Sequence, residues 1–127
     1  EKLTEFKNRG FRLAVASTDR HEPIEKSFEA LGACALFDII VGVDDVVNGK
    51  PSPDMLHKIM KQTALKSDEI IIVGDSVYDM KMGRNAGLKA CIGVLTGSCN
   101  REKLEPFADA VLDSVADLKV RAQSMHL

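Results

Sequence analysis

The sequence is poor in aromatic residues and has no strongly charged segment. Its 127 residues include no tryptophan, one tyrosine and five phenylalanines, and the formal net charge is only −2. Without a basic run or interleaved aromatic residues, the chain has no electrostatic basis for binding nucleic acid or an anionic membrane surface. No apolar stretch approaches the length of a membrane span. We therefore expect neither nucleic acid nor membrane as a partner.

Cysteine is also scarce. Cys34, Cys91 and Cys99 are odd in number, lack CxxC spacing and lie in or beside apolar stretches. This pattern does not indicate a disulfide framework or a zinc site, so the expected location is the reducing cytoplasm.

Short apolar stretches alternate with segments of helical periodicity along the whole chain. An apolar content of 45% in 127 residues fits one domain with a real core. We expect strands at 11–17, 36–43, 70–74, 89–95 and 109–113, and helices before Gly10, over 23–31, 53–63 and 77–86, and after Ser114. This alternation implies parallel pairing with right-handed crossovers. The expected fold class is α/β, with a doubly wound, three-layer parallel sheet of Rossmann-like type.

The stretch IIIVGDSVYDM, residues 70–80, contains an unbroken apolar run that leads directly into two carboxylates. Such a run suits a strand covered on both faces, as in a parallel sheet flanked by helices. Asp75 and Asp79 then lie just past the carboxyl end of this strand, where open α/β sheets bind ligands.

Polar side chains follow the other strands in the same way. Ser17 and Thr18 follow the first strand, and Lys50 follows the second after a short loop. Because the carboxyl ends of parallel strands meet at one edge, we expect these residues to converge with the two aspartates. A hydroxyl, a lysine and carboxylates in one crevice suit a phosphate group together with a hard divalent cation such as Mg²⁺.

Three stretches in order, AVAST (14–18), GKPSPDML (49–56) and VGDSVYDM (73–80), resemble motifs two, three and four of the haloacid dehalogenase superfamily. The phosphoglycolate phosphatase-like branch is the most similar, and the resemblance runs over essentially the whole chain. It implies a Mg²⁺-dependent phosphomonoester hydrolase that acts on a small phosphorylated metabolite through an aspartyl-phosphate.

The resemblance also implies a role for each candidate residue. Ser17 would hydrogen-bond the transferring phosphoryl group, with Thr18 as a further phosphate contact. Lys50 would neutralise that group and the nucleophile. Asp75 would bind Mg²⁺, and Asp79 would orient the metal-site network. These groups position and stabilise a phosphoryl group, but none of them attacks it.

The nucleophile motif of the family, DxDx[TV], is not in this sequence. Asp44 and Asp45 are adjacent instead of alternate, and the later aspartates are spaced by three intervening residues. In this branch a helical cap domain lies between motifs one and two. We therefore expect residues 1–127 to be a single, incomplete core domain, the C-terminal part of a longer phosphatase, without the cap and inactive by itself.

In the family, the strand that carries the nucleophile is the middle strand of the sheet. Its loss would leave two interior edges unpaired, and each buried unsatisfied backbone group costs about 1 to 3 kcal/mol. A few such groups would offset a total stability of about 5 to 15 kcal/mol. We expect the sheet to close up, to exchange a strand with a neighbour, or to be completed by its missing part, whether or not that part is seen.

Other interpretations stay open for the individual residues and for the function. Asp79 could cap its own helix with Ser76, and Lys50 taken singly could be a solvated loop residue. The histidines lack metal-ligand spacing and are interpreted as surface residues: His21, His57 and His126. A phosphoacceptor receiver domain has similar length and residue types, but its acidic pair follows the first strand and its lysine the last. A non-catalytic relative of the fold is the third possibility.

Overall fold

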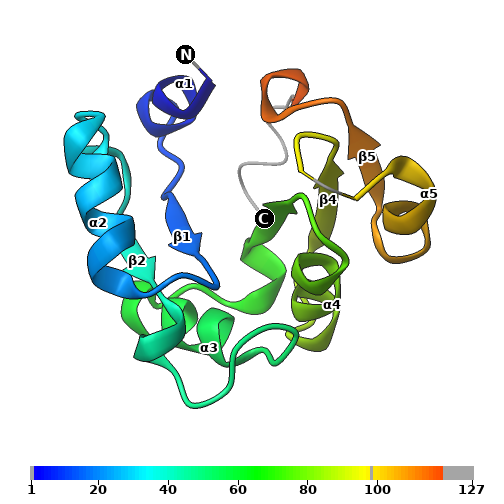
Figure 1. Ribbon diagram of the computed structural model, residues 1–127, viewed down its shortest axis with the longest axis horizontal. Helices are drawn as coiled ribbons and strands as arrows, with labels where there is room; N and C mark the ends of the chain where they lie inside the picture. The colour runs from blue at the N-terminus through cyan, green and yellow to red at the C-terminus, as the bar shows by residue number, and fades with distance from the viewer. Residues whose placement is uncertain (1, 98, 119–127) are drawn as a thin grey trace.

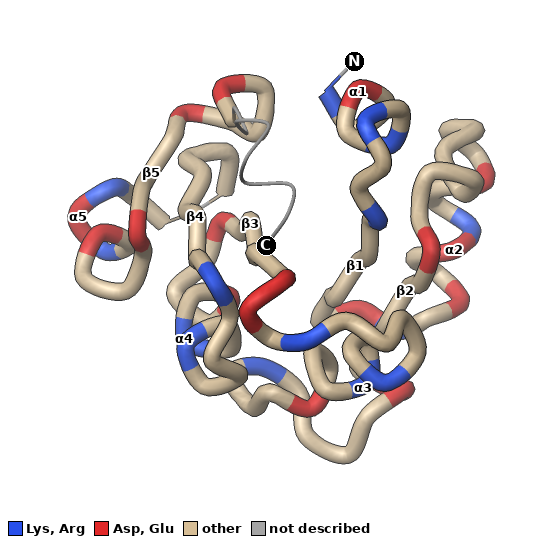
Figure 2. The backbone as a smooth tube through the Cα atoms, turned by 180° about the vertical axis from the view of Figure 1, so that it is seen from behind, with Lys and Arg blue, Asp and Glu red and all other residues tan. Residues whose placement is uncertain are grey.

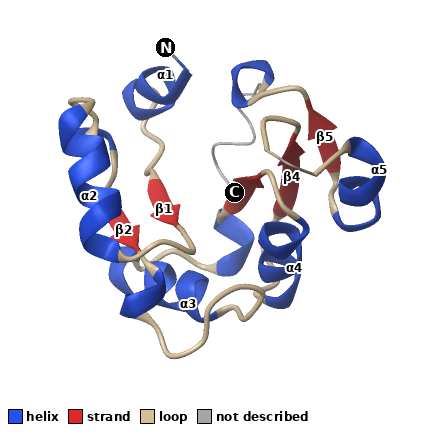
Figure 3. Ribbon diagram, viewed as in Figure 1, coloured by secondary structure: helices blue, strands red, loops and turns tan. Residues whose placement is uncertain are grey.

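The computed structural model describes residues 2–97 and 99–118 of the chain, with strands and helices alternating along it (Figure 3). The α-helices are α1 (Lys2–Asn8), α2 (His21–Ala30), α3 (Asp54–Thr63), α4 (Val77–Asn85) and α5 (Arg101–Leu104). The strands are β1 (Ala14–Ala16), β2 (Ile39–Val41), β3 (Ile71–Gly74), β4 (Ala90–Val94) and β5 (Ala110–Leu112). Short 3-10 helices lie between them: η1 (Cys34–Leu36), η2 (Val43–Asp45), η3 (Ser67–Glu69), η4 (Glu105–Phe107) and η5 (Val115–Asp117).

Within the described residues the strands form two parallel sheets, β1–β2 and β3–β4–β5. The expected α/β class and parallel pairing are confirmed. The sheet does not close up, however: β1 and β3 are the facing edges of the two sheets and do not pair with each other (Figure 1). Closure, one of the three arrangements expected from the sequence, is therefore not what the structure shows.

A single apolar cluster joins the two sheets through α3 and α4. Its buried members are Val41, Met55, Leu56, Ile59, Met82 and Leu88. Ala16 of β1 and Ile72 of β3 pack against the same cluster, one from each sheet. Because α3 packs against β1 and β2, α4 packs against β3 and β4, and the two helices meet in this cluster, β1 and β3 are held apart instead of collapsing onto each other.

Two aspartates set the register at the starts of the strands that they precede. Asp38, just before β2, accepts a hydrogen bond from the Leu13 N–H at 2.9 Å, while its own N–H donates to the Leu13 carbonyl at 2.7 Å. The hydrogen bond from the Lys7 ammonium holds the pKa of Asp38 below its ordinary value. Asp109, just before β5, makes the same pair of bonds with Cys91, each at 2.7 Å.

Two helices begin at other residues than the sequence predicted. The second helix begins at His21, two residues before Pro23, because the Asp44 carboxylate accepts the His21 N–H at 2.8 Å and caps the first turn from another loop. The third begins at Asp54, with Pro53 as its N-cap residue instead of its first residue. After Ser114 the described residues contain only η5, and the rest of the expected final helix lies outside them.

Charge and thiols follow the expectations from composition. Figure 2 shows lysine and arginine interspersed with acidic residues along the backbone. The three cysteines are free thiols. Among the described helices, none combines the length and the apolar character that a membrane-spanning segment needs.

Candidate active site

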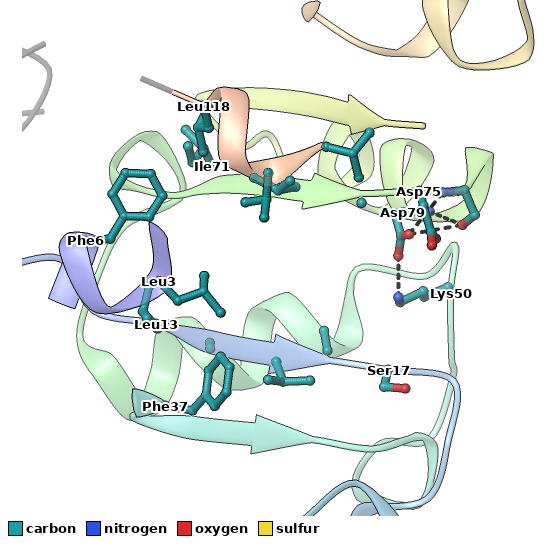
Figure 4. A pocket seen from close by; sticks show the side chains of 18 of the residues that line it. Leu3, Phe6, Leu13, Ser17, Phe37, Lys50, Ile71, Asp75, Asp79 and Leu118 are labelled. Carbon is teal, nitrogen blue, oxygen red and sulfur yellow. Dashed lines mark hydrogen bonds and ion pairs between the residues drawn. The ribbon is translucent and has the colours of Figure 1, made fainter. Parts of the chain in front are cut away.

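A cleft of about 800 Å³ lies between β1 and β3, and we call it the central cleft. Figure 4 shows the two strands running in the same direction along its sides, with polar side chains where they end and apolar side chains elsewhere. All five residues singled out from the sequence line it: Ser17, Thr18, Lys50, Asp75 and Asp79. Within the described chain, Asp75 and Asp79 supply the only carboxylates of its lining.

Lys50 and Asp79 form an ion pair in which each side chain is only 10% exposed (Figure 4). The Lys50 ammonium donates to Oδ1 of Asp79. The ion pair gives the Lys50 ammonium a defined position, and its remaining N–H groups can still donate to a phosphate oxygen.

Asp79 also caps α4, as the alternative interpretation proposed. Its Oδ2 accepts from the N–H of Ser76 at 3.3 Å and from the Ser76 hydroxyl at 3.1 Å, while the Ser76 Oγ accepts from the Asp79 N–H at 3.2 Å. The cap and the ion pair use different oxygens of one carboxylate. The helix start therefore orients Asp79 toward Lys50.

Close backbone packing at Gly74 makes room for this carboxylate. A Cβ at Gly74 would lie 2.5 Å from both the Cβ and Oδ2 of Asp79. Only glycine at the end of β3 allows the first turn of α4 to fold back so tightly over the strand.

Asp75 is exposed and makes no hydrogen bond or ion pair with any other described residue. It lies close against the loop after β4, since a Cβ at Gly97 would be 2.5 Å from its Oδ2. A free carboxylate fixed at a strand end is a suitable oxygen ligand for Mg²⁺, which takes one or two protein carboxylates and fills its shell with water and phosphate. The described residues contain no cluster of three or more His, Cys, Asp or Glu that could hold a metal by themselves.

Ser17 and Thr18 lie at the opposite side of the cleft. Ser17 extends the pairing of β1 with β2, because its N–H donates to the Val41 carbonyl at 3.0 Å. Its hydroxyl oxygen accepts from the Asp19 N–H at 3.1 Å, which is the local turn cap that serine often makes. The hydroxyl proton remains available to a ligand in the cleft.

Several residues that support the site were not identified from the sequence. The Asn85 side chain on α4 donates to the Pro51 carbonyl at 2.9 Å and fixes the loop that carries Lys50. Tyr78, 60% exposed, lines the cleft beside Asp79. His21, interpreted as a surface residue, has two carboxylate partners. Only the tyrosine, one residue before a motif aspartate, had a positional signal in the sequence.

The model of the family described as haloacid dehalogenase-like hydrolase matches residues 1–93. The chain therefore belongs to the haloacid dehalogenase-like hydrolases, the class that the parallel fold and the grouped lysine, serine and aspartates had indicated.

Individual relatives narrow the comparison. The chain is 38% identical over 120 residues to the pyrophosphatase PpaX of Halalkalibacterium halodurans, a match that covers 93% of this chain and 55% of the relative. It is similar to the crystal structure of CbbY from Rhodobacter sphaeroides in complex with xylulose-(1,5)bisphosphate, with TM-score 0.80, 33% identity and coverage of 91% and 52%. A predicted phosphoglycolate phosphatase from Haemophilus somnus gives TM-score 0.85, 26% identity and coverage of 91% and 52%. The chain spans about half the length of these relatives.

Proposed function

We propose that this chain is the phosphate-binding and metal-binding part of a Mg²⁺-dependent phosphatase whose nucleophile comes from a segment outside it. The observation that carries the proposal is the convergence of Ser17, Lys50 and Asp75 on one cleft between two parallel strand ends. The family of the chain supports a hydrolase.

In this proposal each described residue holds or neutralises the phosphoryl group. Lys50, held by Asp79, places a fixed positive charge where negative charge builds up on the phosphoryl oxygens. Ser17 donates its hydroxyl proton to the same oxygens without adding charge. Preorganised groups of this kind lower the barrier because they need no reorientation during the reaction.

Asp75 would hold the metal, with the remaining ligands supplied by the nucleophile segment, water and substrate. A bound Mg²⁺ would add neutralising charge on the phosphoryl oxygens and on the attacking carboxylate. Because the described chain offers one free carboxylate to the metal, we expect only weak Mg²⁺ binding by residues 1–127 alone, and no hydrolysis of a generic phosphate ester.

The substrate class is a small phosphorylated metabolite. The names of the relatives mention pyrophosphate, phosphoglycolate and a sugar bisphosphate, which share a terminal phosphoryl group. Ser17, Lys50 and Asp75 suit that shared group, so the described site supports the class without choosing among its members.

The test is hydrolysis of a phosphate ester by the intact protein, in which the proposed nucleophile segment would be present. Lys50→Ala and Asp75→Asn should each lower kcat/KM by about 100-fold or more, as removal of transition-state charge stabilisation does in other enzymes. Matched controls are Lys61→Ala on the exposed side of α3 and Asp68→Asn in η3, both of which should retain activity. Near-normal rates in Lys50→Ala and Asp75→Asn would remove these residues from the site, and a preceding segment without DxDx[TV] would refute the mechanism.

A further inference from the structure

The loop between β1 and α2, which carries Ser17 and Thr18, is bound to the connection that follows β2. The Val43 N–H donates to the Asp19 carbonyl at 2.8 Å. The His21 N–H donates to Asp44 at 2.8 Å. Both bonds join segments that are more than twenty residues apart in the chain, so the position of the loop depends on them.

The two segments also approach each other so closely that no side chain fits between them. A Cβ at Gly42 would lie 2.4 Å from the His21 nitrogen and 2.8 Å from the Arg20 carbonyl carbon. Glycine at this position is therefore required by the contact itself. Beyond it, the same connection leads through η2 to Lys50, so the contact joins the phosphate-binding hydroxyls to the segment that carries the lysine.

The imidazole of His21 closes this contact. Its Nδ1 lies 2.7 Å from Oδ2 of Asp45, and its Nε2 lies 3.1 Å from Oε2 of Glu25. The same Oδ2 of Asp45 accepts the Gly42 N–H at 2.8 Å. A neutral imidazole has one N–H, so both contacts are hydrogen bonds only when the ring is protonated.

The nearby cations, Lys58 and Arg20, interact with Asp45 and Asp44 instead of with the ring. Lys58 of α3 donates to the Asp45 backbone carbonyl at 3.4 Å, and Arg20 pairs with Asp44 at 3.7 Å. The hydrogen bond that the ring donates to Asp45 raises the pKa of His21 above its ordinary value of about 6.5. Burial alone would raise the pKa of Asp45, but the bonds from Gly42 and His21 outweigh it and lower that pKa.

We propose that protonated His21 is a positioning residue: bound between Asp45 and Glu25, it holds the Ser17–Thr18 loop in its phosphate-binding position, and phosphate binding weakens when the ring loses its proton. This proposal rests on the phosphatase function proposed above. It adds a pH dependence that belongs to the histidine and not to any residue that touches the phosphate.

The direction of this pH dependence follows from the protonated and neutral states of the His21 ring. We call the two contacts of the His21 ring, with Asp45 and with Glu25, the His21 clamp. Both contacts are present below about pH 6.5, where the ring is protonated in folded and unfolded chains alike. The His21 clamp weakens as pH rises through the raised pKa of folded His21, because one ring nitrogen then faces a carboxylate without a proton between them.

The experiment follows two readouts in the intact protein between pH 5 and 9, a range that spans the titration of histidine. Nuclear magnetic resonance monitors the His21 ring proton and the amides of Ser17 and Thr18. Steady-state hydrolysis of a phosphate ester gives KM and kcat. The amides should titrate with the midpoint of His21, and KM should rise about 2- to 5-fold across that midpoint with little change in kcat, as expected for loss of one partly exposed ion pair.

His21→Asn keeps a donor toward Asp45 but cannot titrate. In this variant, the Ser17 and Thr18 amides and the KM should therefore lose this pH dependence. His57→Asn, on the exposed face of α3, should leave it intact. Glu25→Gln should lower the titration midpoint of His21, and the midpoint of the Ser17 and Thr18 amides should move with it. If His21→Asn does not fold, this comparison with the wild-type titration tests the proposal.

The proposal would be overturned if the amides of Ser17 and Thr18 did not change as His21 titrates. It would also be overturned if His21→Asn kept the wild-type dependence of KM on pH. Absence of hydrolysis at every pH would instead overturn the phosphatase function. The amide titration would still show whether protonated His21 holds the Ser17–Thr18 loop.

Discussion

The Asp79 carboxylate has two tasks, of which the sequence suggested only the helix cap. One oxygen completes the cap of α4 with Ser76, and the other holds Lys50. Both tasks depend on the missing side chain at Gly74, over which Asp79 packs. A residue without a side chain thus decides whether the lysine is held in place.

Gly74→Ala should therefore damage both stability and activity. The new Cβ would force Asp79 away from its position, and such overpacking typically costs about 1 to 3 kcal/mol of unfolding free energy. Urea denaturation measures the stability, and phosphate-ester hydrolysis by the intact protein measures the loss of the Lys50 pair.

Gly49→Ala is the matched control for stability, because its Cβ would meet only the Val43 side chain at 3.4 Å. Equal unfolding free energies for Gly74→Ala and wild type would show that Asp79 can relocate freely, contrary to the packing described here.

At the scale of secondary structure, an aspartate makes the same pair of backbone hydrogen bonds at the start of two strands. Asp38 and Asp109 each exchange a pair of hydrogen bonds with the backbone of the neighbouring parallel segment, one step before the regular ladder begins. Each also pairs with a cation, Lys7 or Arg84. Strands of three residues gain a fixed register from these contacts that so short a ladder would not provide alone.

Asp38→Asn should lower the unfolding free energy at neutral pH by roughly 1.5 to 3 kcal/mol, the range for a hydrogen bond to a charged group. Because the pKa of Asp38 is lowered in the folded protein, this stabilisation is present above the ordinary value near 3.9 and is lost as pH falls through the lowered pKa. The difference between wild type and variant should accordingly shrink in acid.

Urea titrations at pH 7 and near pH 3 measure this difference, with Asp68→Asn in η3 as the control. If the difference in unfolding free energy between wild type and Asp38→Asn stayed constant between pH 7 and pH 3, the stabilisation by Asp38 would come from the shape of its side chain instead of its charge.

At the scale of the whole molecule, the two sheets frame a cleft whose sides are the edges of β1 and β3. The N–H groups of Leu13 and Ser17 point toward the β2 side, so by alternation those of Ala14 and Ala16 point into the cleft. An extended segment placed parallel to both strands could pair with each of them. This is where the proposed nucleophile strand would lie.

Hydrogen exchange should report such a strand directly. In residues 1–127 alone, the amides of Ala14 and Ala16 should exchange much faster than that of Ser17, which donates to Val41. In the intact protein, all three should be protected. Fast exchange at Ala14 and Ala16 in the intact protein would mean that no strand pairs with β1.

The sequence by itself determined the class of the fold and the grouping of polar residues at one edge of the sheets. Unbroken apolar runs, glycines after helices and polar residues at strand ends are local signals, and parallel topology then requires the strand ends to share one edge. Ser17, Lys50 and Asp75 could be grouped from that rule alone.

The tertiary structure decided what those residues contact. The pair between Lys50 and Asp79 joins positions 29 apart, and the contact of His21 with Asp45 joins positions 24 apart. The early start of α2 likewise needs Asp44, which is 23 residues away. Such partners depend on the paths of loops and on close packing at glycines, and no local pattern encodes them. The separation of the two sheets was also decided at this level, because α3 packs against one sheet, α4 against the other, and the two helices share one apolar cluster.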